Sequence, residues 1–331
     1  MIELKKNCTL TKLLLSISLL APAFVSAQAW QPSRPIEYVV PSGPGAALDK
    51  AARKLKDMLE SKKQVTQTFT VTNKSGGGGV IALNTLIARP GDAHYLATFT
   101  TGMINARAIG EMPVTYAETT PIALLFEEAI FVAVRADSPF KSAKDLVDKL
   151  KAQPVSLSIA VATAVGNHIH IGIAKPLKVA GVDVSKLTIV PYKSSGDSMT
   201  ALLGGHVDVV SASAPNLIAM YQAGKIRLLA VATAERMPGI LAGVPTWKEQ
   251  GVNATYTSVQ GILAPPGMTQ EQILFWERAI AAVTESEEWN KFLETQYWQP
   301  RFMKSAEMKK YLEREYEATK LLIDEFKLSK K

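Results

Sequence analysis

Residues 36–49 read Ile-Glu-Tyr-Val-Val-Pro-Ser-Gly-Pro-Gly-Ala-Ala-Leu-Asp, and the class of fold follows from this order. Residues 36–40 are β-branched and aromatic apart from Glu37, which predicts a strand that ends at Pro41. Apolar residues then recur at the spacing of one helix face, at Leu48, Ala51, Ala52, Leu55, Met58 and Leu59. The stretch therefore predicts a strand, a Gly/Pro-rich turn and a helix.

The same order recurs along the chain. Residues 69–71 and 95–99 are predicted strands on either side of four glycines (76–79) and a helix over 80–88. Further strands are predicted at 130–134, 157–161, 187–190, 207–210 and 226–232, a helix at 142–150, and a helical end that includes Trp289, Trp298, Tyr311 and residues 305–326. This repetition predicts an α/β fold, a largely parallel sheet with helices on both faces. No flexible linker divides it, which favours two lobes that share strands.

The first 27 residues have the pattern of a secretory signal peptide. Lys5, Lys6 and Lys12 precede an apolar run over 13–25, and small residues then permit cleavage after Ala27 or Ala29. An uncleaved anchor is the alternative, but thirteen helical residues reach only about 20 Å, against roughly 30 Å for a hydrocarbon core. The predicted location of the mature chain is the periplasm. Cleavage would also remove Cys8, the only cysteine, which excludes disulfide and thiolate chemistry.

The composition of the chain limits which classes of binding partner are expected. The 331 residues are 47% hydrophobic and 20% charged, as in a globular protein, and carry a net charge of +7. This excess is small and scattered, whereas nucleic-acid binders concentrate basic residues in a patch. No nucleic acid is expected as a partner, and the net charge is compatible with an anionic small molecule or with no particular partner.

Two loops are candidate anion sites. Residues 41–46 connect a strand to a helix start, where free N–H groups and the helix dipole favour an anion. Thr100, Thr101 and Gly102 follow another strand and add two hydroxyl groups. Ligands of open α/β sheets gather beyond the carboxyl ends of strands, so the two loops could hold one carboxylate together. An ordinary tight turn is the alternative for each.

Other motifs give weak support for a cofactor, a metal or an enzyme. The glycines after Lys74 lack the order of a phosphate loop and indicate close backbone packing, so no cofactor is expected. His168 and His170 could bind a metal, but no third ligand lies nearby in the sequence, and hydrogen-bonding roles are favoured. Ser138 and Lys141 have the spacing of some acyl enzymes without the partner motifs. A hydrolase that uses these residues is the disfavoured alternative.

Eight segments together resemble the solute-binding proteins of tripartite tricarboxylate transporters, the Bug family. They occur in the family's order from about residue 31 to 326. The segments are P-I-E-Y-V-V-P-S-G-P-G-A at 35–46 with Asp49, N-K-S-G-G-G-G at 73–79, T-T-G at 100–102, V-P-Y-K at 190–193, A-L-L-G-G-H-V-D at 201–208, A-G-K-I-R at 223–227, V-P-T at 244–246 and G-I-L-A-P-P-G at 261–267.

The resemblance implies a periplasmic-binding-protein fold of type II-like, two-lobed architecture with two crossing strands. The crossings are expected near 131–136 and 256–264. Residues 30–130 and 260–331 would form lobe 1, and residues 131–259 would form lobe 2. Ligand binding would close the lobes by a hinge motion.

The resemblance also implies which residues bind the ligand. Lobe 1 would hold one carboxylate of an extended acid, and lobe 2 would close over the other end. The residues carried over are, in lobe 1, Ser42, Gly43, Pro44, Gly45, Ala46, Thr100, Thr101 and Gly102, and in lobe 2, Thr163, Ala164, Gly166, Asn167, His168, Ser211, Ala212 and Ser213.

The sequence departs from the family pattern at three places. Ala46 replaces a glycine, Ala212 and Ser213 replace an Asp-Asn pair, and Val259 and Gln260 replace two aromatic residues. The far end of the pocket is therefore expected to differ. The predicted function is capture of a small organic acid, a dicarboxylate or an aromatic carboxylate, and delivery to integral membrane permease subunits, without catalysis. A ligand-dependent partner of a sensor receptor is the alternative.

Overall fold

The computed structural model describes residues 30–162 and 164–329. The predicted signal peptide and Thr163 lie outside the described residues. The strands are β1 (Ile36–Val40), β2 (Phe69–Asn73), β3 (Tyr95–Thr100), β4 (Thr120–Arg135), β5 (Ser158–Ala162), β6 (Thr188–Tyr192), β7 (Val209–Ser213), β8 (Ile226–Val231), β9 (Thr257–Ala264) and β10 (Trp298–Lys304). The helices are α1 (Ala47–Ser61), α2 (Val80–Ile87), α3 (Thr101–Ile109), α4 (Ala143–Ala152), α5 (His168–Val179), α6 (Ser195–Leu203), α7 (Ile218–Gln222), α8 (Gln270–Thr284), α9 (Glu287–Thr295) and α10 (Ser305–Glu325).

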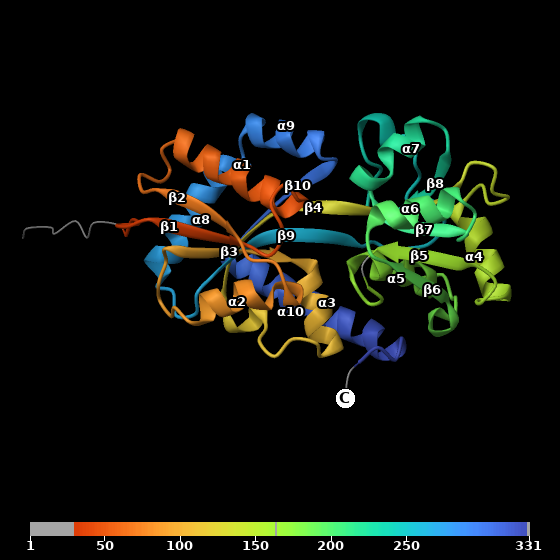
Figure 1. Cartoon of the computed structure of the whole chain (residues 1–331), viewed down its shortest axis with the longest axis horizontal. Helices are drawn as coiled ribbons and strands as arrows, with labels where there is room; N and C mark the ends of the chain where they lie inside the picture. The colour runs from red at the N-terminus through yellow and green to blue at the C-terminus, as the bar shows by residue number, and fades with distance from the viewer. Residues whose placement is uncertain (1–29, 163, 330–331) are drawn as a thin grey trace, which may run out of the picture.

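One mixed sheet runs through the molecule, in the order β2-β1-β3-β9-β4-β7-β5-β6, with β8 and β10 also paired to β4. β1 is parallel to β2 and β3, and β5 is parallel to β6 and β7, whereas β9 and β4 are antiparallel to their neighbours. Figure 1 shows the two ends of the sheet as separate bodies joined by β4 and β9. The predicted α/β class is confirmed, but the expectation of a largely parallel sheet is wrong, because β4 and β9 run antiparallel to every strand they pair with.

The long strand β4 belongs to both ends of the sheet. Residues 120–129 pair with β9, and residues 130–135 pair with β7 and β8, so the change of partner occurs between Ala129 and Ile130. The sequence predicted only residues 130–134 of this strand. Residues 120–129 escape the apolar pattern because they include Pro121, Glu127 and Glu128.

Helices cover both faces of each half of the sheet. In the first half, α1, α8 and α9 pack on one face around Leu55, Trp276 and Trp289, and α2, α3 and α10 pack on the other. In the second half, α4 and α5 cover one face, and α6 and α7 cover the other. Trp289 and Tyr311 are helical and buried, as predicted. Trp298 is buried but belongs to β10, which corrects its predicted place in a helix.

The glycine-rich turn packs closely, as predicted. Gly79 has φ of 107°, and a Cβ there would lie 2.5 Å from Cε of Met103. A side chain at this position would push the flexible end of Met103 aside and would be strained at this φ, so the turn needs glycine chiefly for its conformation.

Asp49 anchors the turn between β1 and α1. Its carboxylate is buried, accepts hydrogen bonds from the Gly45 N–H at 2.8 Å and Asn73 Nδ2 at 2.8 Å, and forms an ion pair with Arg53 at 3.0 Å. Burial by itself would raise the pKa of Asp49, but the hydrogen bonds from Arg53, Gly45 and Asn73 and the Arg53 charge outweigh it and lower the pKa to about 2.

The lowered pKa predicts a loss of stability in acid. The native state favours the carboxylate, so its contribution is complete above the usual pKa of 3.8 and is lost as the pH falls to about 2. Asp49 should contribute about 2 kcal/mol to this decrease in the free energy of unfolding. Urea titrations between pH 5 and pH 2 measure it. Asp49→Asn should remove that decrease, whereas Asp57→Asn, an exposed position on the same helix, should keep it. Equal pH profiles for wild type and Asp49→Asn would contradict this role.

Candidate ligand site

A cavity of about 540 Å³ lies between the two halves of the sheet. Pocket volumes of roughly 300–1,000 Å³ are usual for small-molecule sites. Its lining combines the β1–α1 segment, the turn before α2, the start and one face of α3, and the β5–α5 loop. The lining residues are Pro41, Leu48, Gly78, Thr100, Gly102, Asn105, Ala106, Ile109, Glu111, Ala164, Val165, Asn167 and His168.

Two helices begin at this cavity. α3 starts at Thr101 after β3, and α5 starts at His168 after β5. The first N–H groups of a helix have no partner within it and carry the positive end of the dipole, so both starts favour an anion. Thr100 makes no capping hydrogen bond with its side chain, whereas Asn167 accepts from the His170 N–H at 3.0 Å. The start of α3 therefore has more N–H groups available.

The lining contains no lysine or arginine, and Glu111 is its only acidic residue. His168 is half-buried, and burial lowers its pKa to about 4, which leaves the ring neutral at pH 7. The groups here that favour an anion are therefore the helix ends and the Thr100 hydroxyl rather than a cationic side chain.

The predicted loop residues fall into two groups. Thr100, Gly102, Ala164, Asn167 and His168 come together in the lining of the cavity. The members of the first loop, which are Ser42, Gly43, Pro44, Gly45 and Ala46, are not among the lining residues, although their neighbours Pro41 and Leu48 are. The N–H of Gly45 already donates to Asp49, so it is not free for a ligand.

Thr101 is adjacent to the cavity but its hydroxyl points elsewhere. The side chain is buried, and Oγ1 accepts from the Val259 N–H at 2.7 Å on β9. This bond ties the start of α3 to the crossing strand. A direct hydroxyl contact with a ligand, as expected from the sequence, is absent from this geometry.

The remaining predicted residues lie behind the lining. Gly166 donates its N–H to Nδ1 of His170 at 2.9 Å, and its carbonyl accepts from Nδ2 of Asn105 at 2.9 Å. Ser211, Ala212 and Ser213 are buried in β7, where the Ser211 hydroxyl donates to the Ile169 carbonyl. None of these four residues lines the cavity.

Sequence reasoning missed the face that α3 presents to the cavity. Gly102, Asn105, Ala106 and Ile109 line it at spacings of three, four and seven, which is one side of a helix. Because Gly102 was already a predicted ligand residue, the same helical spacing in the sequence points to Asn105, Ala106 and Ile109. Asn105 is 1% exposed, and its Nδ2 bond to Gly166 joins the two sides of the cavity.

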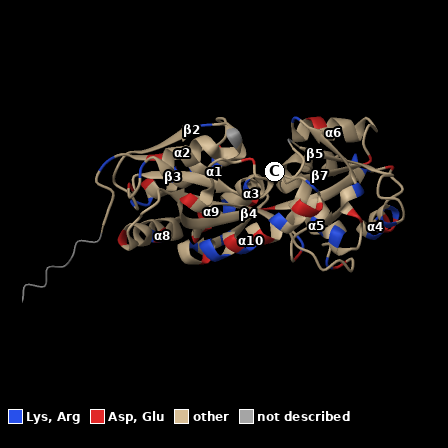
Figure 2. Cartoon of the chain, turned by 90° about the horizontal axis from the view of Figure 1, so that it is seen from below, with Lys and Arg blue, Asp and Glu red and all other residues tan. Residues whose placement is uncertain are grey.

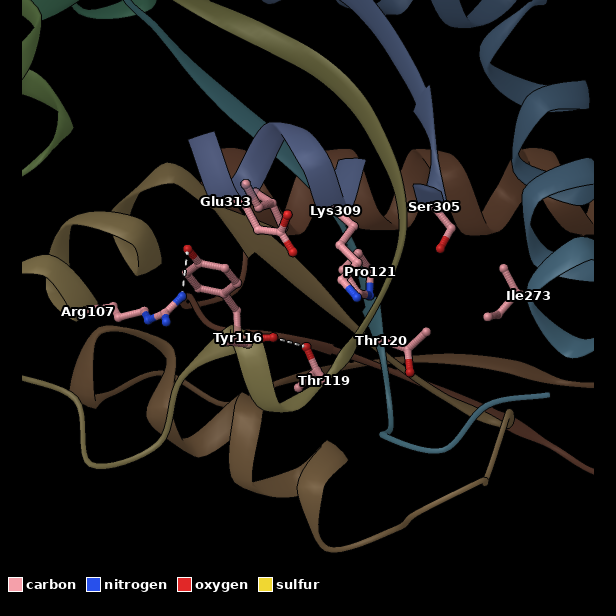
Figure 3. Close-up of a pocket in the computed structure, with 11 residues that line it drawn as sticks. Arg107, Tyr116, Thr119, Thr120, Pro121, Ile273, Ser305, Lys309 and Glu313 are labelled. Carbon is pink, nitrogen blue, oxygen red and sulfur yellow. Dashed lines mark hydrogen bonds between the residues drawn. The ribbon is translucent and has the colours of Figure 1, made fainter. Parts of the chain in front are cut away.

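A second cavity, of about 340 Å³, lies between α3, α10 and the start of β4 (Figure 3). Arg107 donates to the Tyr116 hydroxyl at 3.4 Å, and its guanidinium lies 3.9 Å from the centre of the Tyr316 ring. Lys309 and Glu313 complete one side of it from α10. No predicted ligand residue lies in this cavity.

The residues of the alternative chemistries have structural roles. Ser138 Oγ accepts from the Phe140 N–H at 3.3 Å, and Nζ of Lys141 donates to the Ser138 carbonyl rather than to the hydroxyl. His170 is buried and accepts a hydrogen bond at Nδ1, which assigns the proton of the neutral ring to Nε2. Within residues 30–162 and 164–329, no three His, Cys, Asp or Glu side chains group closely enough to hold a metal.

The buried ring of His170 predicts a second effect of pH on stability, distinct from that of Asp49. Burial lowers the pKa of His170 from 6.5 to about 4, so the unfolded chain binds the proton first. Stability is complete above pH 6.5 and decreases down to about pH 4, by about 3 kcal/mol for this residue. His170→Asn keeps an acceptor for the Gly166 N–H. It should remove this part of the decrease in the free energy of unfolding, as measured by urea titrations between pH 6.5 and pH 4. The exposed His206→Asn should not, and an unchanged profile for His170→Asn would contradict a buried neutral ring.

Comparison with known proteins identifies the family. Residues 51–328 match the model of the tripartite tricarboxylate transporter family receptor, TctC. The chain belongs to this family. A UPF0065 protein of the tcbD-tcbE intergenic region of Pseudomonas sp. (strain P51) is 32% identical over 249 residues, 71% of this chain and 69% of that protein. The predicted membership of the Bug family is confirmed.

Solved structures of the family share the fold. A TctC solute-binding protein from Polaromonas is 25% identical and superimposes with a TM-score of 0.76 over 88% of this chain and 99% of that one. Rpa4515 of R. palustris, solved with adipate, is 26% identical with a TM-score of 0.73 over 89% and 98%. The chain is therefore a solute-binding protein of the TctC family. No helix in the described part of the chain is long and apolar enough to cross a membrane.

Proposed function

We propose that this protein is exported to the periplasm, captures a small dicarboxylate between two lobes and delivers it to a membrane permease of the tripartite tricarboxylate type. The proposal takes residues 30–130 and 260–331 as lobe 1, and residues 131–259 as lobe 2. The observation that carries it is the convergence of the starts of α3 and α5 on one 540 Å³ cavity.

The two helix starts suit an acid with two charged ends. N–H groups at the start of α3 and the Thr100 hydroxyl would bind one carboxylate, and the start of α5 with His168 would bind the other. Leu48, Ala106, Ile109 and Val165 line the same cavity and offer apolar contact to the methylene carbons between them. The adipate bound to the R. palustris relative has this form, which makes it the first probe.

A thermal-shift screen tests the proposal. The chain 28–331 is refolded from denaturant, so that no co-purified ligand masks the response, and is then heated with adipate, malate, citrate, benzoate or a neutral sugar. A ligand at 100 times its dissociation constant adds about 2.7 kcal/mol of stability and raises the melting temperature. An upshift with a dicarboxylate supports the proposal. A shift with the sugar alone would overturn it.

The neighbouring threonines provide a matched pair of variants. Thr100→Val should weaken adipate binding by about tenfold or more, because a hydrogen bond to a charged group contributes about 1.5–3 kcal/mol. Thr101→Val should leave the affinity unchanged and lower the free energy of unfolding by about 1–3 kcal/mol, because the Val259 N–H loses its acceptor. Calorimetry and urea unfolding of both variants measure these effects. The opposite pattern would assign the ligand contact to Thr101.

A further inference from the structure

The end of α10 packs behind the ligand loop 164–168. The first turns of α10 contribute Met308, Tyr311 and Leu312 to a core of the first half of the sheet. Its last turns contribute Leu322 and Ile323 to a core that also contains Ile169 and Ile171 of α5. The helix thus packs against both halves, as α3 also does through Ala108 and Ile109.

The chain turns back after α10 and contacts Gly166. Lys327 has φ of 55°, and the Leu328 N–H donates to the Ile323 carbonyl at 3.0 Å, which directs Leu328 toward the loop. A Cβ at Gly166 would lie 3.4 Å from Cδ1 of Leu328 and 3.5 Å from Cδ1 of Ile323. Cδ1 of Ile109 on α3 would be nearer still, at 2.8 Å, so the loop packs on these two C-terminal side chains together with Ile109.

Two further contacts hold the same segment to α5. The Phe326 ring lies 5.0 Å from the ring of His170, and Glu325 forms an ion pair with Lys178. His170 in turn accepts from the Gly166 N–H. Gly166 is thus held by its N–H bond to His170, by the Asn105 bond to its carbonyl, and by packing against Ile323 and Leu328.

The loop has two sides with different partners. Ala164, Val165, Asn167 and His168 line the cavity, whereas Gly166 does not. None of the C-terminal residues 322–329 lines the cavity. These residues therefore act on a ligand only indirectly, through the position of the loop and of Ile109 on α3, which packs in the same core and lines the cavity.

We propose that residues 323–328 act as a strap that holds the loop 164–168 in its ligand-binding position, so that Phe326 and Leu328 are positioning residues for ligand affinity. This inference rests on the proposed function for its ligand. Without these two side chains, the loop and the start of α5 would become mobile in the free protein. Ligand binding would then have to order them. The affinity loss should appear mainly as faster dissociation.

The test compares a double variant with a control on the same helix. Phe326→Ala/Leu328→Ala should weaken adipate binding at least about fivefold, the lower range of coupling between separate sites. Leu321→Ala, at a position 69% exposed on α10, should bind as the wild type does. Phe326→Leu/Leu328→Met should restore most of the affinity. Calorimetry is done well below the melting temperature of each variant. A double variant that is less stable but binds adipate with wild-type affinity overturns the strap.

A measurement without ligand separates this inference from the proposed function. Amide hydrogen exchange without ligand reports the order of the loop directly. The double variant should speed exchange in residues 164–171, the loop and the first turn of α5, and Leu321→Ala should not. Unchanged exchange there overturns the strap even if adipate does not bind. Faster exchange without adipate binding retains the strap and rejects the ligand.

Discussion

The hydrogen-bonded ladders of β4 are the constraint on which the rest of the structure depends. One strand of sixteen residues pairs with β9 and β10 in the first half of the sheet and with β7 and β8 in the second. Buried backbone groups must keep their partners, so neither half can rotate far without bending the strand near Ala129 and Ile130. The cavity lies where the carboxyl ends of β1, β3 and β5 face each other across this junction.

The site attracts an anion without a basic side chain in its lining. Lys and Arg are instead interspersed with Asp and Glu over the surface, as along α10 in Figure 2. Helix ends present fixed N–H groups with a defined direction, which selects the geometry of a carboxylate as well as its charge. A ligand bound in this way can also leave without breaking a strong ion pair, as the proposed delivery to a permease requires.

The sequence predicts part of this arrangement because loops after parallel strands share one edge of the sheet. The family resemblance implies the loop around His168, and that rule places Thr100 and Gly102 at the cavity but also residues 42–46, which do not line it. It fails for Thr101, whose hydroxyl orientation depends on Val259, 158 positions away in the chain. The sequence does not predict β10 either. In this strand Trp298 stacks on Phe126, a contact that no local pattern encodes.

A structure of the chain 28–331 with the carboxylate that gives the largest thermal shift would show which groups hold the ligand. We expect one carboxylate within about 3.2 Å of N–H groups at the start of α3, and the other end of the ligand at the start of α5. A ligand held by lysine or arginine side chains, or bound in the cavity of Figure 3, would contradict this expectation.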